Sequence, residues 1–338
     1  MQADMTAKNL GFVIKPDRRA FLFGGLVVLG CLNGGADVAV AQATRLSVVA
    51  TTGMIADAAR QVGGDRVDVR ALMGPGVDPH EHRMTQSDIA TTTRAELVLW
   101  HGLNLEAQME PFLKELSRRK RVVAVAESLA KGRLLEDADN KGKFDPHVWM
   151  DPALWSGVVE SVKQAMIAAR PDATSVFEAN AKRHLKELEV LEAYAKRVLI
   201  TVPQPTRTLI TAHDAFGYFG RAFAFRVVGI QGLSTESEAG LNKIREIVEM
   251  TVKEKVPAIF VESSVSNRNI EAVIEGARAK GHGLRLGGEL FSDALGDSDT
   301  YEGTYVGMID HNVTLIARAL GGDAPARGMQ GRLAAPRT

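Results

Sequence analysis

Short apolar runs alternate with amphipathic segments from residue 46 onward. Four runs rich in valine and leucine predict buried strands, at residues 46–50, 67–72, 97–100 and 122–125. Residues 55–62 and 86–93, which lie between them, have the apolar spacing of helices. Strands that alternate with helices are typical of a parallel sheet with helices on its faces, so we expect an α/β unit here.

A long helical pattern follows. Residues 155–169 have apolar positions at helical spacing, and residues 173–200 are rich in alanine, glutamate, lysine and leucine. A helix over the second range would be about 40 Å long, which suits a connection between two domains better than a place inside one. Pro203 and Pro205 end the pattern.

A second α/β pattern occupies the remainder of the chain. We expect strands near 208–212, 227–228, 258–261 and 284–286, and helices near 241–254, 270–280 and 306–320. The predicted fold is therefore two α/β lobes of parallel sheet with flanking helices. We divide the chain into a signal segment (1–43), an N-terminal lobe (44–170), a linking helix (171–202), a C-terminal lobe (203–322) and a flexible tail (323–338).

The N-terminus has the features of an export signal. Arg18 and Arg19 form a twin-arginine pair ahead of the apolar run 21–32, and Ala41-Gln42-Ala43 is a small-x-small cleavage sequence. These features predict twin-arginine export to the periplasm. Cys31 offers a second possibility, lipidation, which the bulky Leu29 and the better downstream site disfavour.

The amino-acid composition excludes several classes of partner and metal ligand. The 338 residues are 45% hydrophobic, enough for a large core, and Lys+Arg and Asp+Glu balance at 41 each. No overall field therefore favours nucleic acid or an anionic membrane. Cys31 is the one cysteine and lies in the signal segment, so the mature chain forms no internal disulfide and offers no thiolate to a metal.

Four loop segments carry side chains that could bind a metal ion. The candidates are His80 and His147, each in an Asp-Pro-His sequence, together with His213 and Asp293. Each follows a predicted strand, and ligands of open α/β sheets gather beyond the carboxyl ends of strands. A lone loop histidine is more often a surface residue than a ligand, but proline stiffens the approach to His80 and His147. Three imidazoles and one carboxylate suit zinc or manganese.

Six stretches, in the same order, resemble the zinc/manganese receptors of ABC importers, the TroA-like family. They are residues 48–52, 76–81, 102–106, 145–152, 211–219 and 290–296. The resemblance runs from about residue 46 to 320. It implies two lobes joined by one rigid long helix, with the ion in the cleft between them, bound by His80, His147, His213 and Asp293. It also implies delivery to a membrane permease that has a separate ATPase subunit.

The identity of the metal stays open at this level. Residues 130–144 lack the His-rich loop of many dedicated zinc receptors, whereas a histidine at position 213 replaces the glutamate of many manganese receptors. Three nitrogens favour zinc slightly. Among the remaining histidines, His82 could chelate together with His80 but is expected to be a bystander. His101 is expected to cap a turn or line the cleft, and His184 to pack in the long helix, whereas His282 and His311 match no ligand of the family pattern. Glu262, at the end of a predicted strand, could support a ligand from behind, although ordinary loop hydrogen bonding is the expected role. Trp149 and Phe216 are expected to wall the site.

Other functional classes fit less well. A metallohydrolase would need an open coordination position, and the chain lacks His-Glu-x-x-His. No Gly-x4-Gly-Lys-Ser/Thr sequence is present, so any ATPase is another protein. An adhesin of the same fold is the alternative that the sequence does not separate from an importer receptor. We expect a monomer that is not an enzyme.

Overall fold

The computed structural model describes residues 45–138 and 140–334. The chain divides into two units, Met1–Gln42 and Ala43–Thr338, and the described residues all belong to the second. The predicted export signal, with the twin arginines and Cys31, lies outside the described residues. Within the described ranges no helix is both long and apolar enough to cross a membrane.

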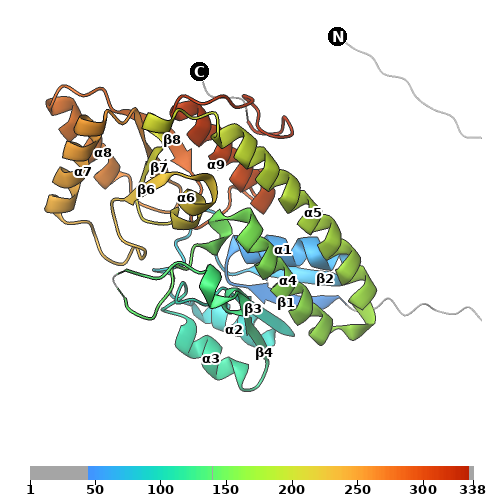
Figure 1. Cartoon of the computed structure of the whole chain (residues 1–338). Helices are drawn as coiled ribbons and strands as arrows, with labels where there is room; N and C mark the ends of the chain where they lie inside the picture. The colour runs from blue at the N-terminus through green and yellow to red at the C-terminus, as the bar shows by residue number, and fades with distance from the viewer. Residues whose placement is uncertain (1–44, 139, 335–338) are drawn as a thin grey trace, which may run out of the picture. The chain divides into compact units, whose positions relative to one another are not determined.

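The N-terminal lobe is a four-stranded parallel sheet covered by helices (Figure 1). Its strands lie in the order β2-β1-β3-β4, and their bounds are β1 Leu46–Ala50, β2 Val67–Ala71, β3 Leu97–Trp100 and β4 Arg121–Ala124. Its helices are α1 Gly53–Gly63, α2 Gln86–Arg94, α3 Glu110–Ser117 and α4 Pro152–Ala169. The predicted α/β unit is confirmed, and α3 is an addition to the helices expected there.

The C-terminal lobe has two parallel strand pairs, β5-β6 and β7-β8, and β5 lies against β7. The strands are β5 Thr208–Thr211, β6 Arg226–Gly229, β7 Ala258–Glu262 and β8 Arg285–Leu290. The helices are α6 Gly217–Phe223, α7 Leu241–Glu254, α8 Arg268–Ala279 and α9 Tyr305–Ala319. Short 3-10 turns complete the described chain at Gly64–Arg66, Ala126–Ser128, Lys131–Arg133, Val148–Met150, Pro171–Ala173 and Gln204–Thr206.

Helix α5, Thr174–Leu199, joins the two lobes (Figure 1). Its 26 residues contain neither glycine nor proline, so no residue type that commonly kinks a helix interrupts it. One face is buried and packs on α1 and α4 of the N-terminal lobe and on α6 and α9 of the C-terminal lobe. At 1.5 Å per residue the helix is about 39 Å long, as the composition predicted.

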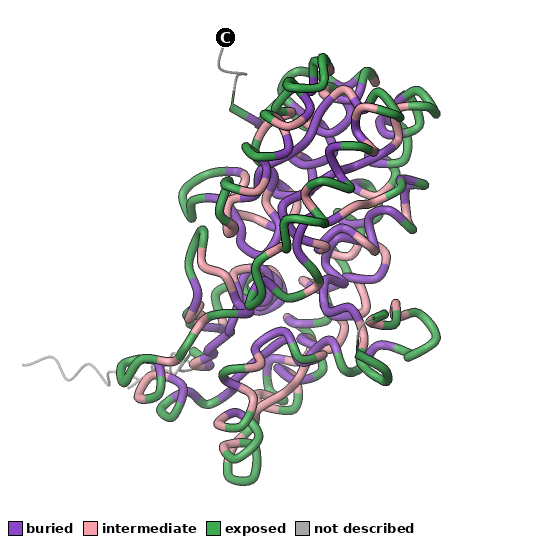
Figure 2. Tube along the Cα trace, turned by 90° about the vertical axis from the view of Figure 1, so that its left-hand side faces the viewer, coloured by how far each residue is buried: buried purple, intermediate pink, exposed green. Residues whose placement is uncertain are grey.

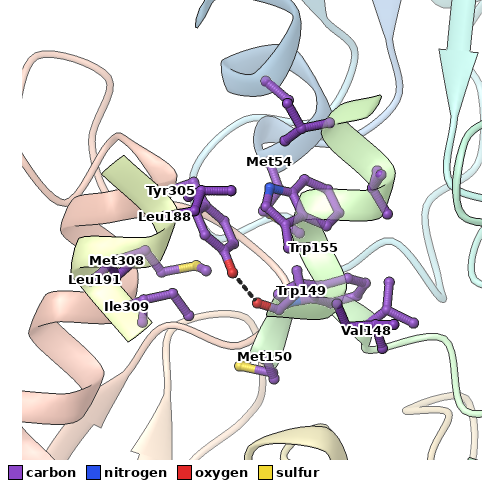
Figure 3. Packing of buried hydrophobic residues seen from close by; sticks show 14 of the residues in the cluster. Met54, Val148, Trp149, Met150, Trp155, Leu188, Leu191, Tyr305, Met308 and Ile309 are labelled. Carbon is purple, nitrogen blue, oxygen red and sulfur yellow. Dashed lines mark hydrogen bonds between the residues drawn. The ribbon is translucent and has the colours of Figure 1, made fainter. Parts of the chain in front are cut away.

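One hydrophobic core continues across both lobes. Leu188 and Leu191 of α5 pack beside Trp155 of α4 and beside Tyr305 and Met308 of α9 (Figure 3). The rings of Trp155 and Tyr305 are stacked with their centroids 5.3 Å apart. The Tyr305 hydroxyl donates to the backbone oxygen of Trp149 over 2.7 Å. The lobes are therefore joined by side-chain packing as well as by α5, and buried positions run through both (Figure 2).

The C-terminal segment corrects one prediction. We expected a flexible tail from residue 323, because no apolar periodicity is present there. The structure instead packs this segment on α9: the Met329 amide donates to both carboxylate oxygens of buried Asp310, at 2.9 Å each. Leu333 is only 4% exposed, and the Arg332 guanidinium lies 4.3 Å from the centre of the Tyr301 ring. The prediction is wrong for residues 323–334 because tertiary contacts, not local periodicity, order them.

Candidate metal centre

Four loop residues that are far apart in the sequence meet where the lobes face one another. His80 follows β2 and His147 precedes the turn Val148–Met150, so both come from the N-terminal lobe. His213 follows β5 and Asp293 follows β8, in the C-terminal lobe. One ligand atom from each lies within 4.8 Å of those of the other three, and no side chain is more than 3% exposed. The structure thus brings together all four residues selected from the sequence.

The spacing of the nitrogens fits a small tetrahedral ion. The His147 Nε2 atom lies 3.3 Å from Nε2 of His80 and 3.4 Å from Nε2 of His213. Two nitrogens that each lie ~2.05 Å from a tetrahedral zinc ion are about 3.3 Å apart. Asp293 Oδ2 lies 3.3 Å from His213 Nε2, and Asp293 Oδ1 lies 3.6 Å from His147 Nε2.

One buried oxygen of this cluster has no protein donor. Asp293 Oδ1 has no hydrogen-bond partner among the described residues, although the side chain is buried. A buried carboxylate oxygen without a partner carries a large desolvation cost. A cation bound between the three imidazoles and Asp293 would remove that cost.

Two further carboxylates orient the imidazoles from behind. Asp145 Oδ1 accepts from His147 Nδ1 at 2.8 Å and from the His147 amide at 2.9 Å. Glu262, at the end of β7, accepts from His213 Nδ1 at 2.5 Å and from the His213 amide at 2.9 Å. A proton on Nδ1 leaves the Nε2 lone pair free to bind a metal. Of the two roles that the sequence allowed for Glu262, the structure therefore shows the less favoured one, support of a ligand.

The position of Glu262 was the available signal for this role. It lies at the carboxyl end of β7, which neighbours the strand that ends beside His213. Parallel strands place their carboxyl ends at one edge of a sheet, so Glu262 and His213 were candidates for contact.

Burial and neighbouring charges shift the pKa values of the proposed ligands in opposite directions. Burial, opposed by the charge of Asp293 and reinforced by the neighbouring imidazoles, lowers the pKa of His80 to about 3, so this side chain stays a neutral ligand. Burial also lowers the pKa of His213, but Asp293 and Glu262 outweigh it and raise that pKa well above its usual value. Burial raises the pKa of Asp293, yet His213 and the other imidazoles hold it below its usual range. The cluster is built to hold positive charge, either as a proton or as a cation.

The surroundings exclude water on one side. The Trp149 ring lies 5.2 Å from the His147 ring, and its Nε1 donates to the Ser292 backbone oxygen at 2.7 Å, which joins the two lobes beside the centre. Phe216 is also fully buried, and its ring contacts that of Phe219 in the core of the molecule.

The remaining described histidines lie outside the cluster. His82 Nε2 is 3.7 Å from Asp88, and His101 Nε2 is 2.7 Å from the Pro146 backbone oxygen. His184 contacts Glu187, whereas His282 and His311 contact the backbone oxygens of Val256 and Glu289. None of these five described histidines belongs to the cluster, and His184 is buried in α5 as expected.

Comparison with known proteins places the chain in a family. Residues 48–319 match the family model described as zinc-uptake complex component A, periplasmic. The manganese-binding lipoprotein MntA of Bacillus subtilis (strain 168) is 43% identical over 301 residues, which cover 89% of this chain and 97% of that protein. The zinc-binding protein TroA of Treponema pallidum (strain Nichols) is 42% identical over 300 residues, which cover 87% and 96%.

Solved structures agree with these matches. The periplasmic zinc-binding protein TroA from Treponema pallidum matches with a TM-score of 0.80 and 43% identity, over 82% of this chain and 99% of that one. Fe(III)-bound YtgA from Chlamydia trachomatis matches with a TM-score of 0.75 and 28% identity, over the same shares of the two chains. The relatives' names mention zinc, manganese and iron, so the overall fold does not select one metal.

Proposed function

The chain belongs to the periplasmic zinc-uptake component A family, and from that premise we propose that it captures a divalent transition-metal ion outside the cytoplasm and delivers it to an ABC permease. The observation that carries this proposal is the buried cluster of three imidazoles and one carboxylate, with Nε2 atoms 3.3–3.4 Å apart. The metal is cargo in this scheme.

The ligands of the proposed cargo are His80, His147, His213 and Asp293. Support comes from their shared burial, from the partnerless Asp293 oxygen and from the carboxylates that orient His147 and His213. Four protein ligands complete a tetrahedral shell and leave no position for a reactive water, which favours transport over hydrolysis. Three nitrogen donors bind zinc more tightly than manganese, so we propose zinc as the tighter of the two.

The partners are a membrane permease and a separate ATPase subunit, and we propose that the receptor itself is monomeric. We further propose that residues 1–43 direct twin-arginine export and are removed after Ala43. MntA and several other relatives are named lipoproteins, which supports a lipid on Cys31 instead. Intact mass of the exported protein, with Cys31→Ala as control, separates the two: a lipidated chain starts at Cys31 and loses its lipid in the variant.

A metal titration tests the main proposal. The mature chain is purified from metal-poor medium and its Tm is followed as zinc or manganese is added. An ion that binds only the folded state stabilises it by about 2.7 kcal/mol at a hundredfold excess over Kd. We expect both ions to raise the Tm, zinc more than manganese. The rise in Tm should be smaller at pH 5 than at pH 7 because protons compete with the metal for the imidazoles. No rise with either ion would overturn the proposal.

A further inference from the structure

A cavity connects one ligand of the centre to solvent. It has a volume of about 230 Å³, and His80 is the ligand that lines it. The N-terminal lobe contributes Leu103, Asn104 and Lys143 to its wall, and the C-terminal lobe contributes Gly232, Leu233 and Ser234. The larger cavity beside Ser263 and Phe291, about 630 Å³, is lined by none of the four ligands. The cavity beside His80 is therefore a route that an ion could take to the centre.

One segment of the C-terminal lobe, residues 231–240 between β6 and α7, borders this cavity; we call it the strap. Its start is fixed beside His213, since the Gln231 amide donates to the Ala212 oxygen at 2.9 Å and the Asp214 amide donates to the Gly232 oxygen at 3.2 Å. One end of the strap is thus tied to the loop that carries a ligand of its own lobe.

The middle of the strap is tied to the opposite lobe. The Thr235 hydroxyl donates to Asp78 Oδ2 at 2.5 Å, and Gln108 Nε2 donates to Glu236 Oε1 at 2.6 Å. Thr235 is only 7% exposed, and a hydrogen bond to a charged acceptor away from water is stronger than one between neutral groups. The Gln108–Glu236 bond is exposed and contributes less.

Asp78 links this contact to the ligand itself. Its other oxygen, Oδ1, accepts from the His80 amide at 2.8 Å. A single carboxylate therefore holds the strap with one oxygen and the backbone of His80 with the other. Moving the strap away would open the wall of the cavity and would also free Asp78, which positions the His80 loop.

We infer that the strap closes the passage of the metal ion and that Thr235, through Asp78, is the positioning residue that sets how fast the ion leaves. The inference rests on the proposed function, because it requires a metal at the four ligands. In this scheme His80 is the ligand that releases first, since it lines the cavity and sits in a loop tied to the strap. The other three ligands keep their places while the ion departs.

Release kinetics test the inference. Zinc-loaded wild-type protein and variants are mixed with an excess of a fluorescent zinc chelator, and the release rate is followed by stopped flow. Thr235→Val removes the hydroxyl at nearly constant volume, and we expect release about tenfold faster. Thr235→Ser keeps the hydroxyl and should stay within about twofold of wild type. Thr251→Val is the matched control, because Thr251 is buried in α7 and its hydroxyl bonds only within that helix.

Hydrogen exchange and melting give the second readout. In the zinc-loaded Thr235→Val protein, amides of residues 231–240 should exchange faster while those of α5 do not change. Melting temperatures check that each variant is folded, and Thr235→Ala takes the place of Thr235→Val if valine does not fit. The inference would be overturned if folded Thr235→Val released zinc at the wild-type rate. It would also be overturned if Thr251→Val accelerated zinc release as much as Thr235→Val does. If wild-type protein retained neither zinc nor manganese, the proposed function itself would fail.

Discussion

At the scale of single residues, the carboxylates behind the histidines hold two of the proposed ligands in place. Glu262 fixes both the ring and the backbone of His213. We expect Glu262→Gln to weaken zinc affinity about 10–100-fold, because the amide neither supplies charge nor reliably selects the Nδ1–H form of the ring. Competition titration against a chelator measures the change. Glu289→Gln, an exposed position on the neighbouring strand β8, is the matched control and should bind as wild type does. Equal affinities for the two variants would contradict this role of Glu262.

At the scale of elements, we expect α5 to limit how far the lobes can move. It has no glycine or proline, and its buried face packs on both lobes. The hydrogen bonds from Tyr305 to Trp149 and from Trp149 to Ser292 also join the two lobes near the metal centre. We therefore expect metal release to proceed through loops, with the lobes nearly fixed. Small-angle scattering of metal-free and zinc-loaded protein should give the same radius of gyration within error. A clear increase on metal removal would show hinge opening and defeat the rigid-helix prediction.

At the same scale, the sequence predicted the features that are determined by residues close together in the chain. Val- and Leu-rich strands and the uninterrupted α5 are visible as patterns, and ordered loop motifs selected four side chains that meet in the structure. The C-terminal segment was missed because Asp310 orders it through the Met329 amide. Thr235 and Asp78 were not paired in advance, since they are 157 residues apart and nothing in either sequence neighbourhood indicates the other. Such contacts depend on how the lobes are packed.

At the scale of the whole molecule, a buried acid makes stability depend on pH. Burial raises the pKa of Glu106 to about 7, against hydrogen bonds from Thr51, His101 and Gly102 that lower it. The unfolded chain releases this proton near pH 4.5 and the folded one near 7. The stabilising contribution is therefore full below pH 4.5 and is lost as the pH rises through 7.

This contribution predicts a difference between wild type and Glu106→Gln. From pH 5 to pH 8 the metal-free wild type should lose roughly 2–3 kcal/mol of unfolding free energy more than Glu106→Gln does. Urea unfolding of both proteins at the two pH values measures it. Glu275→Gln, at an exposed position on α8, should follow the wild-type pH dependence. If the unfolding free energies of wild type and Glu106→Gln changed equally from pH 5 to pH 8, the Glu106 carboxyl would be ionised in the folded state over that range.

The core that crosses the lobes also has a consequence for biosynthesis. Helix α9 is made after the whole N-terminal lobe, yet its first residue, Tyr305, donates its amide to Asp57 of α1 at 2.9 Å and stacks its ring on Trp155 of α4. A ribosome-bound chain that ends before residue 305 has the complete N-terminal sheet but leaves this apolar face uncovered. The early lobe must wait for α9 before its surface closes. We therefore expect a chain truncated before residue 305 to expose this apolar face and to aggregate more readily than the full chain.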